Sequence, residues 1–183
     1  YALQSTVSRC QPFSRGLLMD SYELALELGQ KAKRRGVTVA TAESCTAGGL
    51  GFEITAVPGS SEWYERGFIT YTNRAKEEML GVKAETLAAF GAVSCETARE
   101  MACGALEHSG AQLSVSITGI AGPGGAVPGK PVGTVCFGVA LKADGKATVQ
   151  TSRMQFEGSR DDVRRQSIRY ALQLLCKALG DKC

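Results

Sequence analysis

Histidine is almost missing from the sequence: His108 is the only one in 183 residues. It precedes Ser109 and Gly110 at the predicted end of a helix, where a cation complements the helix dipole, so a Ser-His-Asp triad is not expected. Cys-x-x-Cys, Gly-x-Ser-x-Gly and Ser-x-x-Lys patterns are also absent. These absences exclude the usual zinc sites and the commonest serine-hydrolase motifs.

The sequence also lacks a large excess of positive or negative charge. The net charge is +3 and is spread along the sequence without a basic tail or block. The longest apolar runs have the length of strands, far below the roughly 20 residues that span a bilayer. We therefore expect neither a nucleic-acid partner nor a membrane partner.

The seven cysteines do not form a disulfide pattern. Their number is odd, and four of them fall inside apolar segments. These four are Cys45, Cys103, Cys136 and Cys176. Reduced thiols in a cytoplasmic protein are the better interpretation.

Residues 1–18 lack an initiator Met, a clear periodicity and the charged start and apolar core of a signal peptide. We expect them to be a poorly structured or cloning-derived N-terminal extension, with Met19 as the natural start. Residues 19–183 are long enough for a single domain with a substantial core.

Helix and strand patterns alternate along the rest of the chain. Five helices are predicted. The first covers residues 20–36, and the second is short and runs toward Ala56. The other three begin after a cap at Asn73, after a cap at Ser94 and near Asp161. Strands are predicted over residues 37–41, 68–72, 113–118, 132–142 and 147–156, with a loop over 57–67 and a hairpin at 143–145. This order predicts an α/β fold, a three-layer α/β/α domain with a mixed, mostly parallel sheet, whose ligands bind at the carboxyl ends of strands.

Side chains that could act as nucleophiles follow the first predicted strand, in the segment from Glu43 to Thr46. Without a suitable histidine, the usual base for such a group is a lysine with a depressed pKa. Lys76 and Tyr71 lie where a predicted strand passes into a helix, and partial burial would lower the lysine pKa. Lys76 could equally be a solvated helix residue and Tyr71 an ordinary strand aromatic.

The glycine-rich run over residues 119–133 follows a buried strand. Residues 124–130 match Gly-x4-Gly-Lys, but Pro131 replaces the magnesium-binding hydroxyl and a strand follows, which excludes a Walker A loop. Its glycines suit close approach of backbone to a ligand, although a flexible surface loop is an alternative. Arg160, beside Ser159, could hold a phosphate or be a surface charge.

Several long segments occur together in one order that resembles a known family. They are "TAESCT", "PGSSEWYERGFITYTNRAKEEMLGV", "GAVS", "SITGIAGPGG" and "KPVGTV". Over roughly residues 20–180 the chain resembles the C-terminal domain family of the competence/damage-inducible protein CinA, whose stand-alone members include nicotinamide-nucleotide amidohydrolases.

The resemblance implies hydrolysis of the carboxamide of nicotinamide mononucleotide to nicotinate mononucleotide and ammonia, in pyridine-nucleotide salvage. It implies Ser44 as nucleophile and Lys76 as base, with Ser61 and Tyr71 assisting at the reacting centre. Amides at the start of the following helix would stabilise the oxyanion. The substrate-binding positions implied are Thr46, Thr118, Gly122, Gly124, Gly125 and Arg160. Neither a cofactor nor a metal is implied.

One residue departs from the family pattern: Ala47 stands where glycine usually follows "AESCT". Alanine would distort or narrow the site if this position has a positive φ, and would be harmless if it is helical.

Two other functions remain open at this stage. One is a non-catalytic nucleotide-binding or interaction protein linked to competence or DNA damage. The other is a serine/lysine amidase that acts on a different small amide. A homo-oligomer is the expected assembly for a small cytosolic enzyme.

Overall fold

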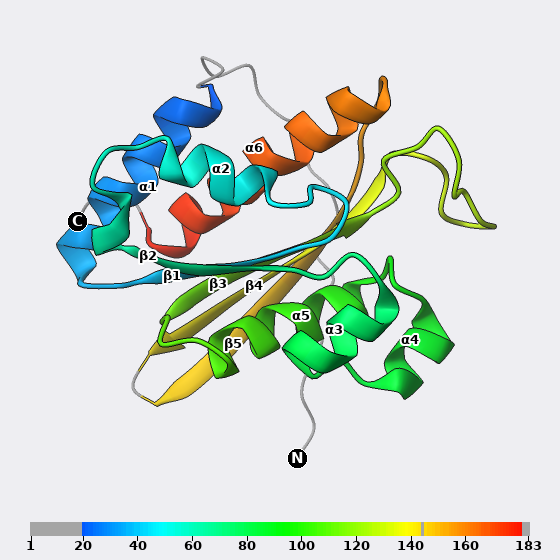
Figure 1. Cartoon of the computed structure of the whole chain (residues 1–183), viewed down its shortest axis with the longest axis horizontal. Helices are drawn as coiled ribbons and strands as arrows, with labels where there is room; N and C mark the ends of the chain where they lie inside the picture. The colour runs from blue at the N-terminus through cyan, green and yellow to red at the C-terminus, as the bar shows by residue number, and fades with distance from the viewer. Residues whose placement is uncertain (1–19, 144, 181–183) are drawn as a thin grey trace.

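A computed structural model describes residues 20–143 and 145–180 (Figure 1). The predicted extension over residues 1–18 lies outside these described residues. The helices are α1 (Ser21–Arg35), α2 (Gly49–Thr55), the 3-10 turn η1 (Ser60–Glu62), α3 (Asn73–Leu80), α4 (Ala84–Phe90), α5 (Cys95–Glu107) and α6 (Arg160–Ala178). The strands are β1 (Val39–Glu43), β2 (Tyr64–Ile69), β3 (Leu113–Gly119), β4 (Thr134–Ala143) and β5 (Lys146–Gln155).

The five strands form one sheet in the order β2-β1-β3-β4-β5. β1 pairs in parallel with both β2 and β3, whereas β4 is antiparallel to both β3 and β5. Only β4 therefore runs against the other four strands. The predicted mixed, mostly parallel sheet is confirmed, and β4–β5 form the predicted hairpin.

Helices cover both faces of this sheet. α1, α2 and α6 lie on one face, and α3, α4 and α5 lie on the other (Figure 1). Each layer has its own buried apolar cluster against the sheet. The apolar residues that recur with helical periodicity on the inner faces of α1, α5 and α6 are buried: Leu24, Ala25, Leu28, Ala32, Ala98, Met101, Ala102, Ala105, Leu106, Ile168, Ala171, Leu172, Leu175 and Leu179.

Helix ends follow the expected capping chemistry in most places. α1 begins with the capping box between Asp20 and Glu23 and ends at Gly36, whose φ of 61° lies in the left-handed region. Ser94 caps α5 as predicted. For α3, however, Thr72 accepts the capping hydrogen bond and Asn73 is the first helical residue, so the predicted cap was wrong by one position.

Two further elements differ from the sequence prediction. β2 begins at Tyr64 rather than Phe68, because the Pro-Gly-Ser turn ends at η1 and Tyr64 then pairs with Val39. The Tyr64 hydroxyl also lies 2.8 Å from Thr41 Oγ1. The short helix α4 was not predicted, since it has no side-chain cap and buries only Leu87.

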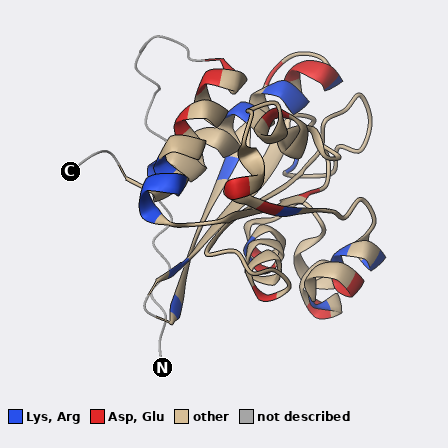
Figure 2. Ribbon diagram, turned by 60° about the vertical axis from the view of Figure 1, so that its left-hand side comes forward, with Lys and Arg blue, Asp and Glu red and all other residues tan. Residues whose placement is uncertain are grey.

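Charged residues of both signs are distributed over the helices of both layers (Figure 2). This distribution agrees with the low net charge of the sequence. Within residues 20–143 and 145–180, no helix combines the length and apolar character that crossing a membrane requires.

Candidate active site

A pocket of about 210 Å³ opens at the carboxyl ends of β1 and β3. This is the edge of the sheet where α/β proteins tend to bind ligands. Its walls come from both helical layers and from the loops between them. The lining residues are Ser44, Cys45, Tyr71, Lys76, Ala92, Val93, Thr118, Gly119, Ala121 and Arg160.

Ser44 is fixed at the end of the sheet. Its backbone N–H donates to Ile117 O at 2.9 Å, which extends the β1–β3 ladder by one residue. Lys76 lies in the first turn of α3, in the helical layer on the opposite face of the sheet from α2. Its Nζ lies 3.1 Å from Ser44 Oγ. The same ammonium nitrogen donates to Thr70 O at 2.8 Å, so the amine is held from two sides.

Burial changes the protonation chemistry of two neighbouring groups. Lys76 is only 1% exposed, and this burial lowers its pKa to about 8. Burial raises the pKa of the adjacent Cys45 thiol to about 11. Cys45 is therefore a protonated thiol at neutral pH, whereas Ser44 contacts a lysine that can act as a base.

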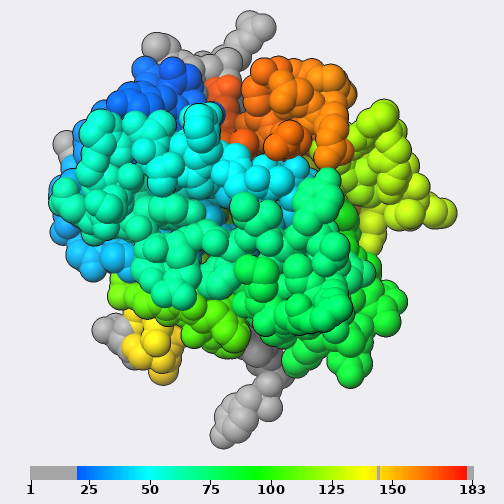
Figure 3. All heavy atoms as spheres, viewed as in Figure 1, coloured from blue at the N-terminus to red at the C-terminus, as the bar shows by residue number. Residues whose placement is uncertain are grey.

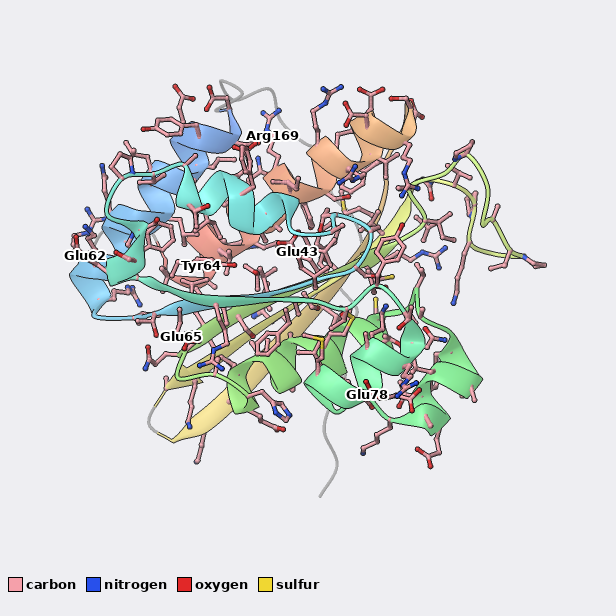
Figure 4. All side chains as sticks on the ribbon, in the orientation of Figure 1. Glu43, Glu62, Tyr64, Glu65, Glu78 and Arg169 are labelled. Atoms are coloured by element: carbon pink, nitrogen blue, oxygen red, sulfur yellow. The ribbon has the colours of Figure 1, made fainter. Side chains whose placement is uncertain are left out.

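Glu43 is a buried carboxylate that sequence reasoning did not assign to the site. It lies at the end of β1 and points toward α2 (Figure 4), and it is 1% exposed. Its carboxylate accepts hydrogen bonds from the N–H groups of Gly48, Leu50 and Gly51 at 2.9–3.0 Å. These are N–H groups of the cap and first turn of α2, which a negative charge stabilises.

The role of Glu43 corrects the expected source of oxyanion donors. Amides at the start of α2 were expected to face the substrate, but they donate to Glu43 instead. In the part of the chain that the structure describes, the amides of Cys45 and Thr46 have no backbone or carboxylate acceptor. They are amides close to Ser44 in sequence that a negative charge in the pocket could use.

The two threonines expected at the substrate have different surroundings. Thr118 lines the pocket, and its hydroxyl donates to Ala92 O at 2.7 Å. Thr46 is fully buried and is not among the lining residues; its hydroxyl donates to Glu43 at 2.6 Å. Arg164, which was not predicted, donates to Thr46 O at 3.2 Å and holds the same turn from α6.

Arg160 connects three parts of the site. It is the first residue of α6, and its guanidinium donates to Gly122 O at 2.8 Å and to Tyr71 Oη at 3.0 Å. Tyr71 is exposed at the pocket mouth, and among the described residues no hydrogen bond joins it to Lys76. Arg160 thus joins the glycine-rich loop to the segment between β2 and α3.

Three predicted positions lie away from the pocket. Ser61 is exposed in η1, before β2 begins, whereas Ser44 follows the carboxyl end of the parallel strand β1. The two serines are therefore at opposite ends of the sheet. Gly124 and Gly125 are exposed in a loop that projects from the right of the molecule (Figures 1 and 3). This loop is held by Lys130, which donates to Phe90 O at 2.6 Å.

Ala47 adopts the backbone conformation that glycine favours. Its φ is 49°, which makes it the one non-glycine residue with positive φ among those described. The Ala47 amide donates to Ser44 O at 3.1 Å and closes the turn after Ser44. Alanine therefore carries strain at this position, because the left-handed region costs about 1–2 kcal/mol for residues with a Cβ.

A serine hydroxyl beside a buried lysine, in a pocket that an arginine also lines, is an arrangement that a serine/lysine hydrolase could use. Within the described residues no group of His, Cys, Asp and Glu could hold a metal ion. The model of the CinA C-terminal domain family matches residues 21–179. The chain therefore belongs to this family.

Individual relatives agree with that assignment. The chain is 54% identical over 153 residues to nicotinamide-nucleotide amidohydrolase PncC of Escherichia coli K12, which covers 84% of this chain and 91% of that protein. It is 51% identical over 165 residues to a CinA-like protein of Mycolicibacterium gilvum, covering 90% of this chain and 37% of that protein.

A solved structure has the same fold. The competence/damage-inducible protein CihA of Agrobacterium tumefaciens superposes with a TM-score of 0.84 at 42% identity, covering 92% of this chain and all of that one.

Replacing Glu43 tests whether its carboxylate holds the turn between β1 and α2. In Glu43→Gln, whichever way the amide turns, its NH2 group faces a backbone N–H group. We expect a loss of about 1–3 kcal/mol in the free energy of unfolding, measured by urea denaturation. Glu53→Gln, on the same helix, is the matched control and should change stability by less than about 0.5 kcal/mol. Equal stabilities of the two variants would contradict the assigned role.

Replacing Ala47 with glycine tests the backbone strain. Relief of the left-handed conformation should exceed the entropy that glycine adds to the unfolded chain, leaving a net gain of about 0.5–1 kcal/mol. Thermal unfolding should therefore show a higher Tm for Ala47→Gly. Ala88→Gly, at an exposed position in α4, should instead lose about 1 kcal/mol. A lower Tm for both variants would show that Ala47 is unstrained.

Proposed function

We propose that this chain hydrolyses the carboxamide of nicotinamide mononucleotide, giving nicotinate mononucleotide and ammonia. The contact of 3.1 Å between Ser44 Oγ and Lys76 Nζ is the observation that carries the proposal. The relative with 54% identity, named as a nicotinamide-nucleotide amidohydrolase, supports the choice of substrate.

The reaction begins with the neutral form of Lys76. Its amine donates one N–H to Thr70 O and takes the Ser44 proton while Oγ attacks the carboxamide carbon. The tetrahedral intermediate carries an oxyanion, which we assign to the amides of Cys45 and Thr46. Loss of one such donor typically costs about 10²–10³ in rate.

The second half of the reaction releases both products. The Lys76 ammonium gives its proton to the amide nitrogen, the C–N bond breaks, and ammonia leaves. Ser44 then holds the nicotinoyl group as an ester. Water, deprotonated by Lys76, attacks this ester and frees nicotinate mononucleotide and the serine hydroxyl.

The substrate phosphate is assigned to the opposite side of the pocket. Arg160, the first residue of α6, can pair with a phosphate through its guanidinium. Tyr71, which is bonded to Arg160, orients the guanidinium, and Thr118 contributes to the wall between the two ends of the substrate.

The protein is also proposed to act in the cytoplasm as a homo-oligomer. The five cysteines within the described residues are all free thiols, as is usual in a reducing compartment. Small symmetric oligomers are the commonest assembly of such enzymes.

Ammonia release from nicotinamide mononucleotide tests the function. Wild-type protein should release ammonia, and Ser44→Ala should lower the rate at least about 10³-fold while still binding the nucleotide. Nicotinamide riboside, which lacks the phosphate, should be a poor substrate for the wild type. Binding without ammonia release in the wild type would favour a nucleotide-binding protein instead.

The pH dependence tests the base. Only neutral Lys76 can accept a proton, and its pKa is lowered to about 8, so kcat/KM should rise about tenfold per pH unit below 8 and level off above it. Lys76→Arg should be inactive across this range, because arginine stays protonated. Wild-type activity in Lys76→Arg would exclude Lys76 as the base. A rate that stays constant between about pH 6 and about pH 8 would exclude it as well.

A further inference from the structure

Two cysteines outside the catalytic pair lie in contact beside the pocket. Cys95 is the first residue of α5 and is partly exposed, whereas Cys136 lies in β4 and is 1% exposed. Each thiol shifts the pKa of the other, and neither forms a disulfide. The proposed hydrolysis uses neither of them.

The fold itself brings these thiols together. Thr118, Cys136 and Arg153 are cross-strand neighbours on β3, β4 and β5, so their side chains leave the same face of the sheet. The Thr118 hydroxyl reaches Ala92 O, which places this row under the segment that leads into α5.

A glycine lets the helix approach the strand closely at this point. A Cβ on Gly138, two residues beyond Cys136, would lie 2.4 Å from Ala98 O in the first turn of α5. The start of α5 is thereby packed directly on β4, with Cys95 above Cys136.

The two thiols differ in acidity in the way that a reactive pair requires. The hydrogen bond from Cys136 holds the pKa of Cys95 well below its ordinary value, and a second hydrogen bond from Thr151 and the charge of Arg153 act in the same direction. Burial and the charge of Glu96 oppose this shift. The pKa of Cys136 is raised, so it stays a thiol. A partly exposed thiolate beside a protonated thiol is the arrangement that peroxides oxidise selectively.

We propose that Cys95 and Cys136 form a peroxide-sensitive dithiol that closes to a disulfide and thereby alters the substrate pocket. The Cys95 thiolate attacks one peroxide oxygen, the O–O bond breaks, and water or an alcohol leaves once protonated, with Cys95 now a sulfenic acid. The Cys136 thiol then attacks this sulfur and gives up its proton, the S–O bond breaks, and the sulfenic oxygen leaves as water. The two thiols lose two electrons in all, and the peroxide gains them.

Closure would change the pocket because of where Cys95 is attached. Both thiols are free, so their sulfur atoms must come closer to reach the S–S bond length of about 2.05 Å, and one of the two residues must move. Cys136 is held on both sides by β3 and β5, which leaves the movement to Cys95. Ala92 and Val93, shortly before Cys95, line the pocket and would be displaced with it.

Peptide mapping after oxidation tests the site without reference to catalysis. The full chain is treated with hydrogen peroxide, free thiols are alkylated, and linked peptides are identified by mass spectrometry. We expect a Cys95–Cys136 disulfide that dithiothreitol reverses and that Cys95→Ser abolishes. Cys103→Ser is the matched control, because Cys103 is a partly buried thiol in the same helix with a pKa raised by burial. Alkylation of both Cys95 and Cys136, or a link from Cys95 to another cysteine, would overturn the proposed pair.

Kinetics test the effect on the pocket, and only this part rests on the proposed function. Oxidised wild type should show a KM for nicotinamide mononucleotide raised between about ten- and a hundredfold, since a displacement near 1 Å can cost that much. Reduction should restore the original value, and Cys95→Ser should not respond to peroxide. A disulfide that forms without changing KM would overturn the regulatory claim. If the reduced chain releases no ammonia, the proposed function fails while the mapping result still decides the pair.

Discussion

The site depends on one buried carboxylate that accepts hydrogen bonds from backbone N–H groups and the Thr46 hydroxyl. Glu43 is the last residue of the central strand β1, and its two carboxylate oxygens accept hydrogen bonds from the N–H groups at the start of α2. These N–H groups would otherwise be left without partners at a buried helix end. Glu43 therefore holds the turn between β1 and α2 in place. Ser44 lies in this turn and lines the pocket.

Lys76 completes the pair from the opposite layer of the fold. Its position requires the whole sheet, because α3 packs on one face and α2 on the other. The burial that brings the amine to Ser44 is also what lowers its pKa to about 8. Position and reactivity thus have the same cause, the packing of two layers around the end of β1.

Much of the fold could be predicted from the sequence because it rests on local patterns. Helical periodicity identified the buried faces of α1, α5 and α6, and caps such as Ser94 follow from hydrogen bonding within four residues. α4 was missed because a helix of seven residues without a cap carries too little local signal. The start of β2 was missed because its pairing with β1 is a long-range contact.

The site was less predictable than the fold. Ser44 and Lys76 were assigned by resemblance to a family, since spacing alone could not show that two layers bring them together. The role of Glu43 could not be read from the sequence, because its partners are backbone N–H groups that exist only once α2 has formed. Ser61 shows the converse, since a position matched by motif lies at the far end of the sheet.

The division of the pocket between rigid and irregular segments has a consequence for engineering. The two groups proposed to react lie on regular structure: Ser44 extends the sheet ladder, and Lys76 belongs to a capped helix. Much of the remaining pocket wall comes from loops between helices and strands, which include Ala92, Val93 and Ala121. Loop residues can be exchanged while strands and helices keep their geometry. A library confined to these connecting segments would therefore vary the shape of the pocket and leave Ser44 and Lys76 in place.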